Sequence, residues 1–266
     1  MYQANGTYYT EEHSVSFGDL VTRTSDGQIF VEFNPIANTW TDWHLIPSSR
    51  PAIAHPSFVS KYIEIPGSDG MLDLTDYLTG TAVLGPRQGS LGFYVANKFE
   101  NWETIRQNIV NAIHGKRMKI MLQDDPGYYY EGRFTVGNWE SGADHSAISI
   151  SYQLDPYKMN IRPEGSDYPT LWDPFNFETD YDYSVFYPNV TVTNSEVKTF
   201  DIHTLNFPFE PIITWVSGDV IATFGGVGKR LNSEGSVTLG KATNGMNRLI
   251  ITGNGTVKVY WRGGSL

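Results

Sequence analysis

Cysteine is absent from the 266 residues of this chain, which excludes disulfide bonds, thiolate nucleophiles and cysteine-ligated metal sites. Long apolar runs are also absent: none approaches the ~20 residues that a membrane-spanning helix needs. The N-terminus has neither the basic segment nor the apolar segment of a secretory signal. We therefore expect no membrane partner, and folding in a reducing cytoplasm is compatible with the composition.

Basic charge is scarce as well. The formal net charge is −10 and the isoelectric point is about 5.0. The longest basic cluster is the four-residue segment at 116–119, which contains Lys116, Arg117 and Lys119. Specific binding to nucleic acid relies on a basic surface that neutralises phosphates. The sequence thus argues against a nucleic-acid-binding protein.

Motifs of catalysis and cofactor binding are missing too. The six histidines show no spacing typical of metal ligands on one strand or helix: His13, His44, His55, His114, His145 and His203. No serine-nucleophile elbow, phosphate loop or dinucleotide fingerprint occurs. The glycine-containing segments at 85–89 and 225–228 precede no predicted helix, so we interpret both as turns. We predict no catalytic residue, no metal and no cofactor.

Paired carboxylates keep one enzymatic hypothesis open, because glycosidases use two of them around the scissile bond. The candidate pairs are Asp124 and Asp125, Asp73 and Asp76, and Asp180 and Asp182. The first two pairs fall in segments that we expect to be turns, where aspartate accepts hydrogen bonds from nearby backbone N–H groups. Turn and capping roles are therefore the preferred interpretation.

Aromatic residues, in contrast, reach 14% of the chain and favour a β-rich fold. One convincing helix is expected, with Asn101 as its N-cap and Gly115 beyond its C-terminus. Its apolar residues recur at helical spacing on one face: Trp102, Ile105, Ile109 and Ile113. Glu103 lies in the first turn, where the helix dipole stabilises an anion.

A β-hairpin is predicted directly after this helix. Its strands cover 116–122 and 128–136, and the turn at 124–127 contains Pro126 and Gly127, the latter permitting a positive φ. A third strand is predicted at 147–154, where Ile148, Ile150, Tyr152 and Leu154 alternate with other residues. The first half of the chain is therefore expected to be a β domain with one helix.

The second half is predicted to be a separate antiparallel β-sandwich. We place a first domain at 1–160, an acidic, proline-containing linker at 161–184 and the sandwich at 185–266. Short alternating strands are expected at 190–192, 199–207, 212–216, 220–224, 236–239, 248–252 and 256–262. The predicted turns between them contain Gly225–Gly226, Gly235, Asn244–Gly245 and Asn254–Gly255.

A sugar-binding platform is the functional hypothesis that this half suggests by itself. Trp215 and Trp261 are its main candidates, with Trp172, Phe224 and Tyr260 as further aromatic side chains. The competing interpretation is that these rings pack the interior of the sandwich. Because one face of the strand at 256–262 must be buried, packing is the preferred interpretation.

Five segments in the first half, taken in order, resemble the distal tail proteins of long-tailed bacteriophages, which form the hub ring at the tail tip. They lie at 41–51, 65–75, 85–93, 114–134 and 150–158, and the segment at 114–134 is the most specific. The matching region covers about residues 15–160. The second half matches that family only in length and in β-rich character.

This resemblance implies a structural protein rather than an enzyme. The first half would be the family's belt domain, and six copies would close into a homohexameric ring around a central channel that DNA passes through without specific binding. The second half would be a galectin-like or carbohydrate-module-like sandwich. The ring would contact the tail tube protein, the tail-associated hub protein and receptor-binding proteins. It would belong to the tail tip or baseplate of a virion assembled in the bacterial cytoplasm, or to a tail-like bacteriocin.

Overall fold

The computed structural model describes most of the chain and divides it into two compact units. The first unit comprises residues 1–19, 34–158 and 266, and the second comprises residues 20–33 and 159–265. The described residues are 2–4, 7–25, 28–67, 69–77, 83–95, 102–141, 146–161, 164–165, 190–193, 196–204, 209–242 and 245–266. The predicted linker at 161–184 therefore lies almost entirely outside the described residues, and the predicted domain boundaries stay predictions.

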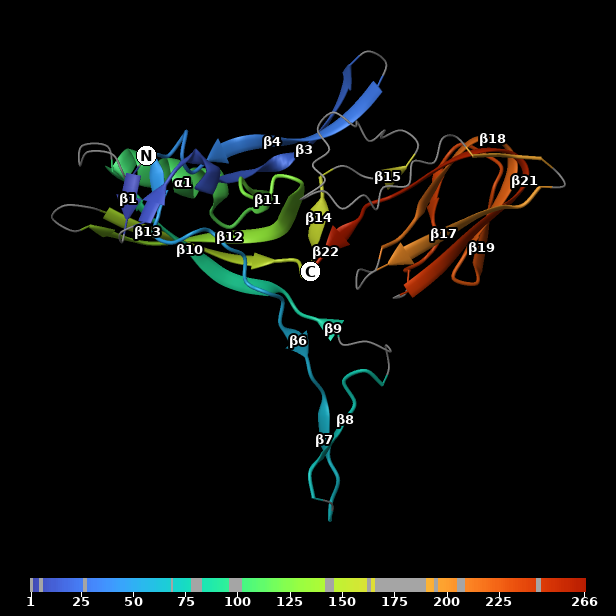
Figure 1. Ribbon diagram of the computed structural model, residues 1–266, viewed down its shortest axis with the longest axis horizontal. Coiled ribbons are helices and arrows are strands. Elements are labelled where there is room, and N and C mark those ends of the chain that lie inside the picture. Colours follow the sequence, from blue (N-terminus) through green and yellow to red (C-terminus); the bar gives the residue numbers. More distant parts are fainter. Residues whose placement is uncertain are drawn as a thin grey trace. The chain divides into compact units, whose positions relative to one another are not determined.

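A mainly antiparallel sheet forms the framework of the first unit (Figure 1). Its strand order is β4-β3-β11-β12-β13-β10-β5. The strands are β3 (Val15–Ser25), β4 (Gln28–Asn38), β5 (Leu45–Pro47), β10 (Arg87–Val95), β11 (Arg117–Leu122), β12 (Tyr128–Ser141) and β13 (Ser146–Leu154). Residues 20–33 of β3 and β4 group with the second unit. A separate small hairpin pairs β1 (Tyr2–Ala4) with β2 (Thr7–Tyr9), and a short 3-10 helix, η1 (Glu11–His13), precedes β3.

The predicted helix is confirmed as α1 (Trp102–Ile113). Ile105, Ile109 and Ile113 are buried, as their spacing indicated. Gly115 has a φ of +73°, the left-handed conformation that ends helices, and its N–H donates to the Phe134 carbonyl at 2.8 Å. The end of the helix is thus fixed to β12. The predicted N-cap, Asn101, lies outside the described residues.

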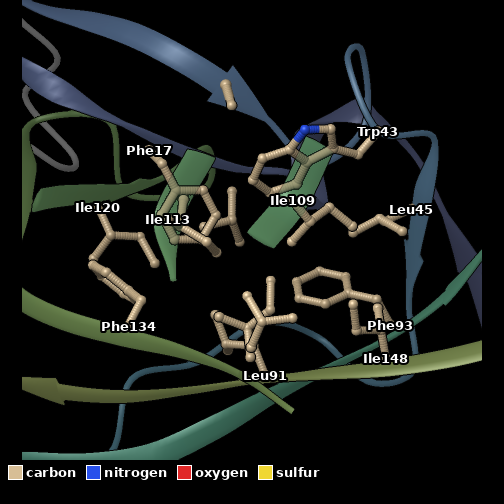
Figure 2. Close-up of a cluster of buried hydrophobic side chains, with 14 of the residues drawn as sticks. Phe17, Trp43, Leu45, Leu91, Phe93, Ile109, Ile113, Ile120, Phe134 and Ile148 are labelled. Atoms are coloured by element: carbon tan, nitrogen blue, oxygen red, sulfur yellow. The ribbon is translucent and has the colours of Figure 1, made fainter. Parts of the chain in front are cut away.

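The core of the first unit lies where α1 covers the sheet (Figure 2). Phe17 of β3 is its aromatic centre: its ring meets Phe134 edge-on at 5.1 Å and lies 5.6 Å from the ring of Trp43. The surrounding apolar side chains come from the sheet, the helix and the segment between β4 and β5. This packing buries the apolar helix face, and most helix stability in proteins comes from such burial.

The hairpin and third strand predicted from the sequence are confirmed as β11, β12 and β13. Residues Ile148, Ile150, Tyr152 and Leu154 of β13 are buried, as expected from their alternation. One detail was wrong: Gly127 does not have a positive φ, and no atom lies within 4 Å of the position that a Cβ would take there. The turn between β11 and β12 therefore does not require glycine at 127.

Residues 52–86 leave the sheet after β5 and return to it at β10, and we call this excursion the arm. It contains two separate antiparallel strand pairs (Figure 1). The inner pair is β6 (Phe58–Val59) with β9 (Val83–Leu84), and the outer pair is β7 (Tyr62–Glu64) with β8 (Met71–Asp73). The sequence reasoning did not identify this element.

The segment at 85–89 was predicted to be a turn, and this is wrong. Arg87, Gln88 and Gly89 are the first residues of β10 and pair with Leu154, Gln153 and Tyr152 of β13. Gly89 lets the Tyr152 side chain lie close to the backbone and does not reverse the chain direction. A Cβ at position 89 would lie 2.4 Å from the Tyr152 hydroxyl oxygen. Local composition gave no sign of this, because Tyr152 is distant in the sequence.

The second unit is built on two long strands, β18 (Ile212–Phe224) and β21 (Gly245–Trp261), which pair antiparallel along most of their length. Shorter strands complete the network. They are β15 (Glu164–Gly165), β16 (Val190–Val192), β17 (Lys198–Thr204), β19 (Val227–Leu231) and β20 (Ser236–Thr238), while β14 (Lys158–Asn160) and β22 (Gly264–Ser265) lie outside this sheet. β15, β16 and β17 pair with β21, whereas β19 and β20 pair with β18, and β14 pairs with β22.

The prediction of separate strands at 212–216 and 220–224, and at 248–252 and 256–262, was wrong. Each pair is one continuous strand, and both strands bend where three glycines meet. A Cβ on Gly218, Gly253 or Gly255 would lie 2.1–2.3 Å from a carbonyl oxygen of the facing strand. Gly218 and Gly253 also have positive φ angles, of +79° and +116°. Asn254–Gly255 is thus part of a bend and not a hairpin turn, whereas Gly225–Gly226 is a turn with two positive φ angles, as predicted.

This bend folds the paired strands into two layers with a shared core. Phe224 belongs to one end of β18, and Trp261 belongs to the far end of β21. The Phe209 ring bridges them, stacked 5.7 Å from Trp261 and 6.2 Å from Phe224. Among the described residues, the chain is mainly β with one α-helix, so the predicted fold class is confirmed. The galectin-like character of the sandwich stays a prediction.

Candidate assembly surface

Three of the six candidate catalytic carboxylates, Asp124, Asp125 and Asp73, make structural contacts, and Asp76 is exposed. Asp124 accepts a hydrogen bond from Arg50 at 2.9 Å, and Asp125 accepts one from Lys158 at 2.7 Å. Asp73 accepts bonds from the hydroxyl and the backbone N–H of Thr75, which lower the pKa of its carboxyl group. This is the capping role that the sequence indicated. Asp180 and Asp182 lie outside the described residues.

Metal-ligating geometry is not seen in the part of the chain that the structure describes. No group of three or more histidine, aspartate or glutamate side chains gathers there. His114 instead accepts the Val136 N–H at 3.1 Å, which fixes the chain after α1 to β12. Over the same residues, no helix is long and apolar enough to span a membrane.

The two aromatic residues proposed as a sugar platform lie in different surroundings. Trp261 is only 3% exposed and stacks on Phe209 within the sandwich core. Trp215 is half-buried, and its indole N–H donates to the Gly218 carbonyl at 2.8 Å, beside the bend of β18. Phe224 is also buried, and Trp172 lies outside the described residues. Tyr260 is half-buried, like Trp215, so the platform stays a prediction that rests on these two side chains.

Exposed apolar side chains gather on the arm. They include Tyr77 at 79%, Phe58 at 65% and Met71 at 61% exposure. The further members of this set are Val59, Tyr62, Ile63, Ile65, Leu72 and Val83, all at least 44% exposed. Singly exposed apolar residues are ordinary, but a contiguous group of them marks an interaction surface.

The register of the arm places apolar side chains on one face of its outer pair. Ile63 lies directly opposite Leu72, and in an antiparallel ladder such partners project to the same face. Ile65 follows the end of β7 and is 44% exposed. Tyr62, opposite Asp73, and Glu64, opposite Met71, lie on the other face. The outer pair of the arm therefore has the apolar pair Ile63 and Leu72 on one face and a mixture of apolar and acidic side chains on the other.

Sequence reasoning missed this surface although a local signal for it exists. Residues 62–65 and 71–74 flank a segment with Pro66, Gly67 and Gly70, which is the pattern of two strands around a turn. The pattern could have predicted the hairpin. It could not have predicted exposure, because strands of this composition are usually buried on one face.

Comparison with solved structures gives a match over nearly the whole chain. The sequence itself matches no family model and no curated protein. The structure, however, is similar to the crystal structure of the SPP1 Dit protein (gp 19.1), described as a paradigm of the hub adsorption apparatus in phages that infect Gram-positive bacteria. The two are 14% identical with a TM-score of 0.53, and the match covers 95% of this chain and 99% of the other. This chain therefore shares the fold of a phage Dit protein, which is the fold that its sequence motifs resemble.

Proposed function

We propose that this chain is a structural component of a phage tail tip. In this role it forms a hexameric ring that connects the tail tube to the hub and to the host-recognition proteins. The observation that carries the proposal is the similarity to the SPP1 Dit protein along 95% of the chain, including both units. No catalytic group is assigned, and the protein is localised to the virion.

The arm supports self-association in this proposal. An isolated two-stranded hairpin is marginally stable in water, and burying exposed apolar side chains such as Ile63 and Leu72 gains free energy. In a closed ring, one patch of each copy meets a different patch of the next copy. We therefore assign the arm to the contact between neighbouring copies.

The test is the oligomeric state of the full-length purified protein, measured by native mass spectrometry and by negative-stain imaging. We expect six-fold rings for the unaltered chain. The double variant Ile63→Ser, Leu72→Ser is expected to abolish rings while changing the free energy of unfolding of the monomer by no more than about 0.5 kcal/mol, since both side chains are exposed.

A matched control is available in the second unit. Val227 and Met246 are 49% and 61% exposed, against 45% and 47% for Ile63 and Leu72. The variant Val227→Ser, Met246→Ser removes similar exposed apolar area outside the arm and is expected to keep the ring. An unaltered chain that stays monomeric at every concentration, and that also fails to assemble with tail tube or hub proteins, would exclude the proposed function.

Glycan binding by the second unit is the alternative that we retain, because Trp215 is an aromatic side chain that is only partly covered. A glycan array or a cell-wall pulldown with the full chain tests it. Loss of binding in Trp215→Ala, with retention in Trp215→Phe, would favour a stacking platform. No binding by the unaltered protein would remove this alternative.

A further inference from the structure

The root of the arm, where the chain leaves and rejoins the sheet, contains a buried arginine. Arg87 is the first residue of β10 and is 2% exposed. Its Nε donates to the Pro156 carbonyl at 2.7 Å, and its Nη1 donates to the Ala54 carbonyl at 2.9 Å. Ala54 lies in the outgoing segment of the arm. One guanidinium thus joins the returning chain, the outgoing chain and the segment after β13.

Tyr152 makes a second hydrogen bond to Ala54. The Tyr152 hydroxyl accepts the Ala54 N–H at 2.8 Å, so both polar backbone groups of Ala54 are held, one by Arg87 and one by Tyr152. Tyr152 lies opposite Gly89, where any Cβ would lie 2.4 Å from its hydroxyl oxygen. Glycine at 89 therefore provides the space in which Tyr152 reaches Ala54.

Gly85, the other glycine of this segment, joins the outgoing and returning segments of the arm. The Gly85 N–H donates to the Ser57 carbonyl at 2.7 Å, and a Cβ on Gly85 would lie 2.6 Å from the Ser57 side-chain oxygen. The Gly-Pro-Arg-Gln-Gly sequence at 85–89 is neither a turn nor a phosphate loop. Each of its glycines permits a close approach at the root of the arm.

Burying the charged guanidinium of Arg87 costs desolvation free energy, so a side chain that only fills this space would not need to be arginine. No carboxylate among the described residues pairs with it, and its Nη2 is buried without a hydrogen-bond partner. Burial lowers its pKa, and the Tyr130 ring covers it at 5.3 Å. An apolar side chain avoids that desolvation, whereas a guanidinium offers several donors in a rigid plane that can hold two segments in a fixed relation.

We infer that Arg87 and Tyr152 are positioning residues that set the direction in which the arm leaves the sheet. This inference rests on the proposed function, because direction matters when the arm must reach a neighbouring copy. A rigid root restricts the arm to orientations that close a ring, while a loosened root allows open or mixed assemblies. The pair acts on the arm, and the exposed apolar side chains of the arm make the contact itself.

Hydrogen exchange on the full-length protein tests the inference at the level of single amides. In Tyr152→Phe, which removes one hydroxyl and keeps the ring over Gly89, the Ala54 and Gly85 amides are expected to exchange at least tenfold faster. Amides of α1 are expected to be unchanged. Arg87→Met is expected to have the larger effect on the same amides, with faster tryptic cleavage at the exposed Lys61 of the arm.

A control variant separates this role from a general loss of arginine. Arg133 also donates to a backbone carbonyl, that of Gly115 at 2.9 Å, but away from the arm. Arg133→Met is expected to leave arm exchange and Lys61 cleavage as in the unaltered protein. Native mass spectrometry of Tyr152→Phe is expected to give a mixture of assemblies in place of one ring.

Three outcomes would overturn the inference. The first is that the amides of the arm exchange in Tyr152→Phe and Arg87→Met at the same rate as in the unaltered protein. Equal acceleration in α1 would be another, because it would mean that the residues stabilise the whole unit. Uniform rings in both variants despite faster arm exchange would be the third. If the unaltered chain forms no rings and does not assemble with tail tube or hub proteins, the proposed function fails, whereas the exchange data still decide whether Arg87 and Tyr152 hold the arm.

Discussion

The arm of the first unit and the sandwich of the second are both built of antiparallel strands, but the sandwich buries its apolar side chains and the arm exposes them. In the sandwich, the bend of β18 and β21 brings two layers together, so that Ile213, Val259 and Ile251 have no exposed surface. In the arm, Ile63 and Leu72 are 45% and 47% exposed, and no second layer of the described residues covers them. The sandwich therefore supplies its own core, while in the proposed ring a neighbouring copy covers the exposed side chains of the arm.

The largest loss in the free energy of unfolding is expected from adding a side chain to a glycine at the bend of the sandwich. Gly218→Ala introduces a Cβ 2.1 Å from the Asn254 carbonyl oxygen at a φ of +79°. Left-handed geometry costs about 1–2 kcal/mol and overpacking about 1–3 kcal/mol, so we expect a loss of up to ~5 kcal/mol. Hydrogen exchange should show β18 and β21 opening while α1 stays protected.

Gly127→Ala is the matched control for that substitution. Position 127 has open space around a new Cβ and no positive φ. The free energy of unfolding is expected to change by no more than about 0.5 kcal/mol, as for other surface substitutions. A large loss at 127, or none at 218, would mean that close approach and positive φ do not distinguish the two glycines.

The second largest effect is expected in the core of the first unit. Ile109 of α1 has no exposed surface, and Ile109→Ala is expected to lower the free energy of unfolding of the first unit by ~2–5 kcal/mol. Asn111→Ala, on the exposed face of the same helix, should change it little. Denaturant unfolding followed by tryptophan fluorescence measures both. A first unit that tolerates Ile109→Ala without loss of stability would contradict the burial of Ile109 in the core.

The smallest expected effect is electrostatic. Hydrogen bonds from Arg106 and Gln107 lower the pKa of Glu103 to about 2, from an ordinary value of 4.5. A depressed pKa contributes stability that is present above pH 4.5 and is lost as the pH falls toward 2. Because the group is fully exposed, the contribution to unfolding is small. In Arg106→Ala, a carboxyl titration followed by NMR should move the Glu103 pKa up toward 4.5, and an unmoved value would exclude the ion pair.

Periodicity predicted those elements whose burial follows from their own sequence. The spacing of Ile105, Ile109 and Ile113 identified α1, and the alternation of Ile148, Ile150 and Tyr152 identified β13. Glycine was less informative, because the same residue marks a turn at 225–226, a bend at 253–255 and a close side-chain contact at 89. These three roles differ only in what lies opposite the glycine.

The chain's sequence by itself therefore determined the fold class, the single helix and the hairpin that follows it, since these depend on residues close together in the chain. Only the tertiary structure decided that 85–89 opens a strand, that β18 and β21 are continuous, and that an apolar arm stays uncovered. The physical reason is that burial, close backbone approach and hydrogen bonds such as those of Arg87 to Ala54 and Pro156 join residues far apart in sequence. No local pattern contains that information.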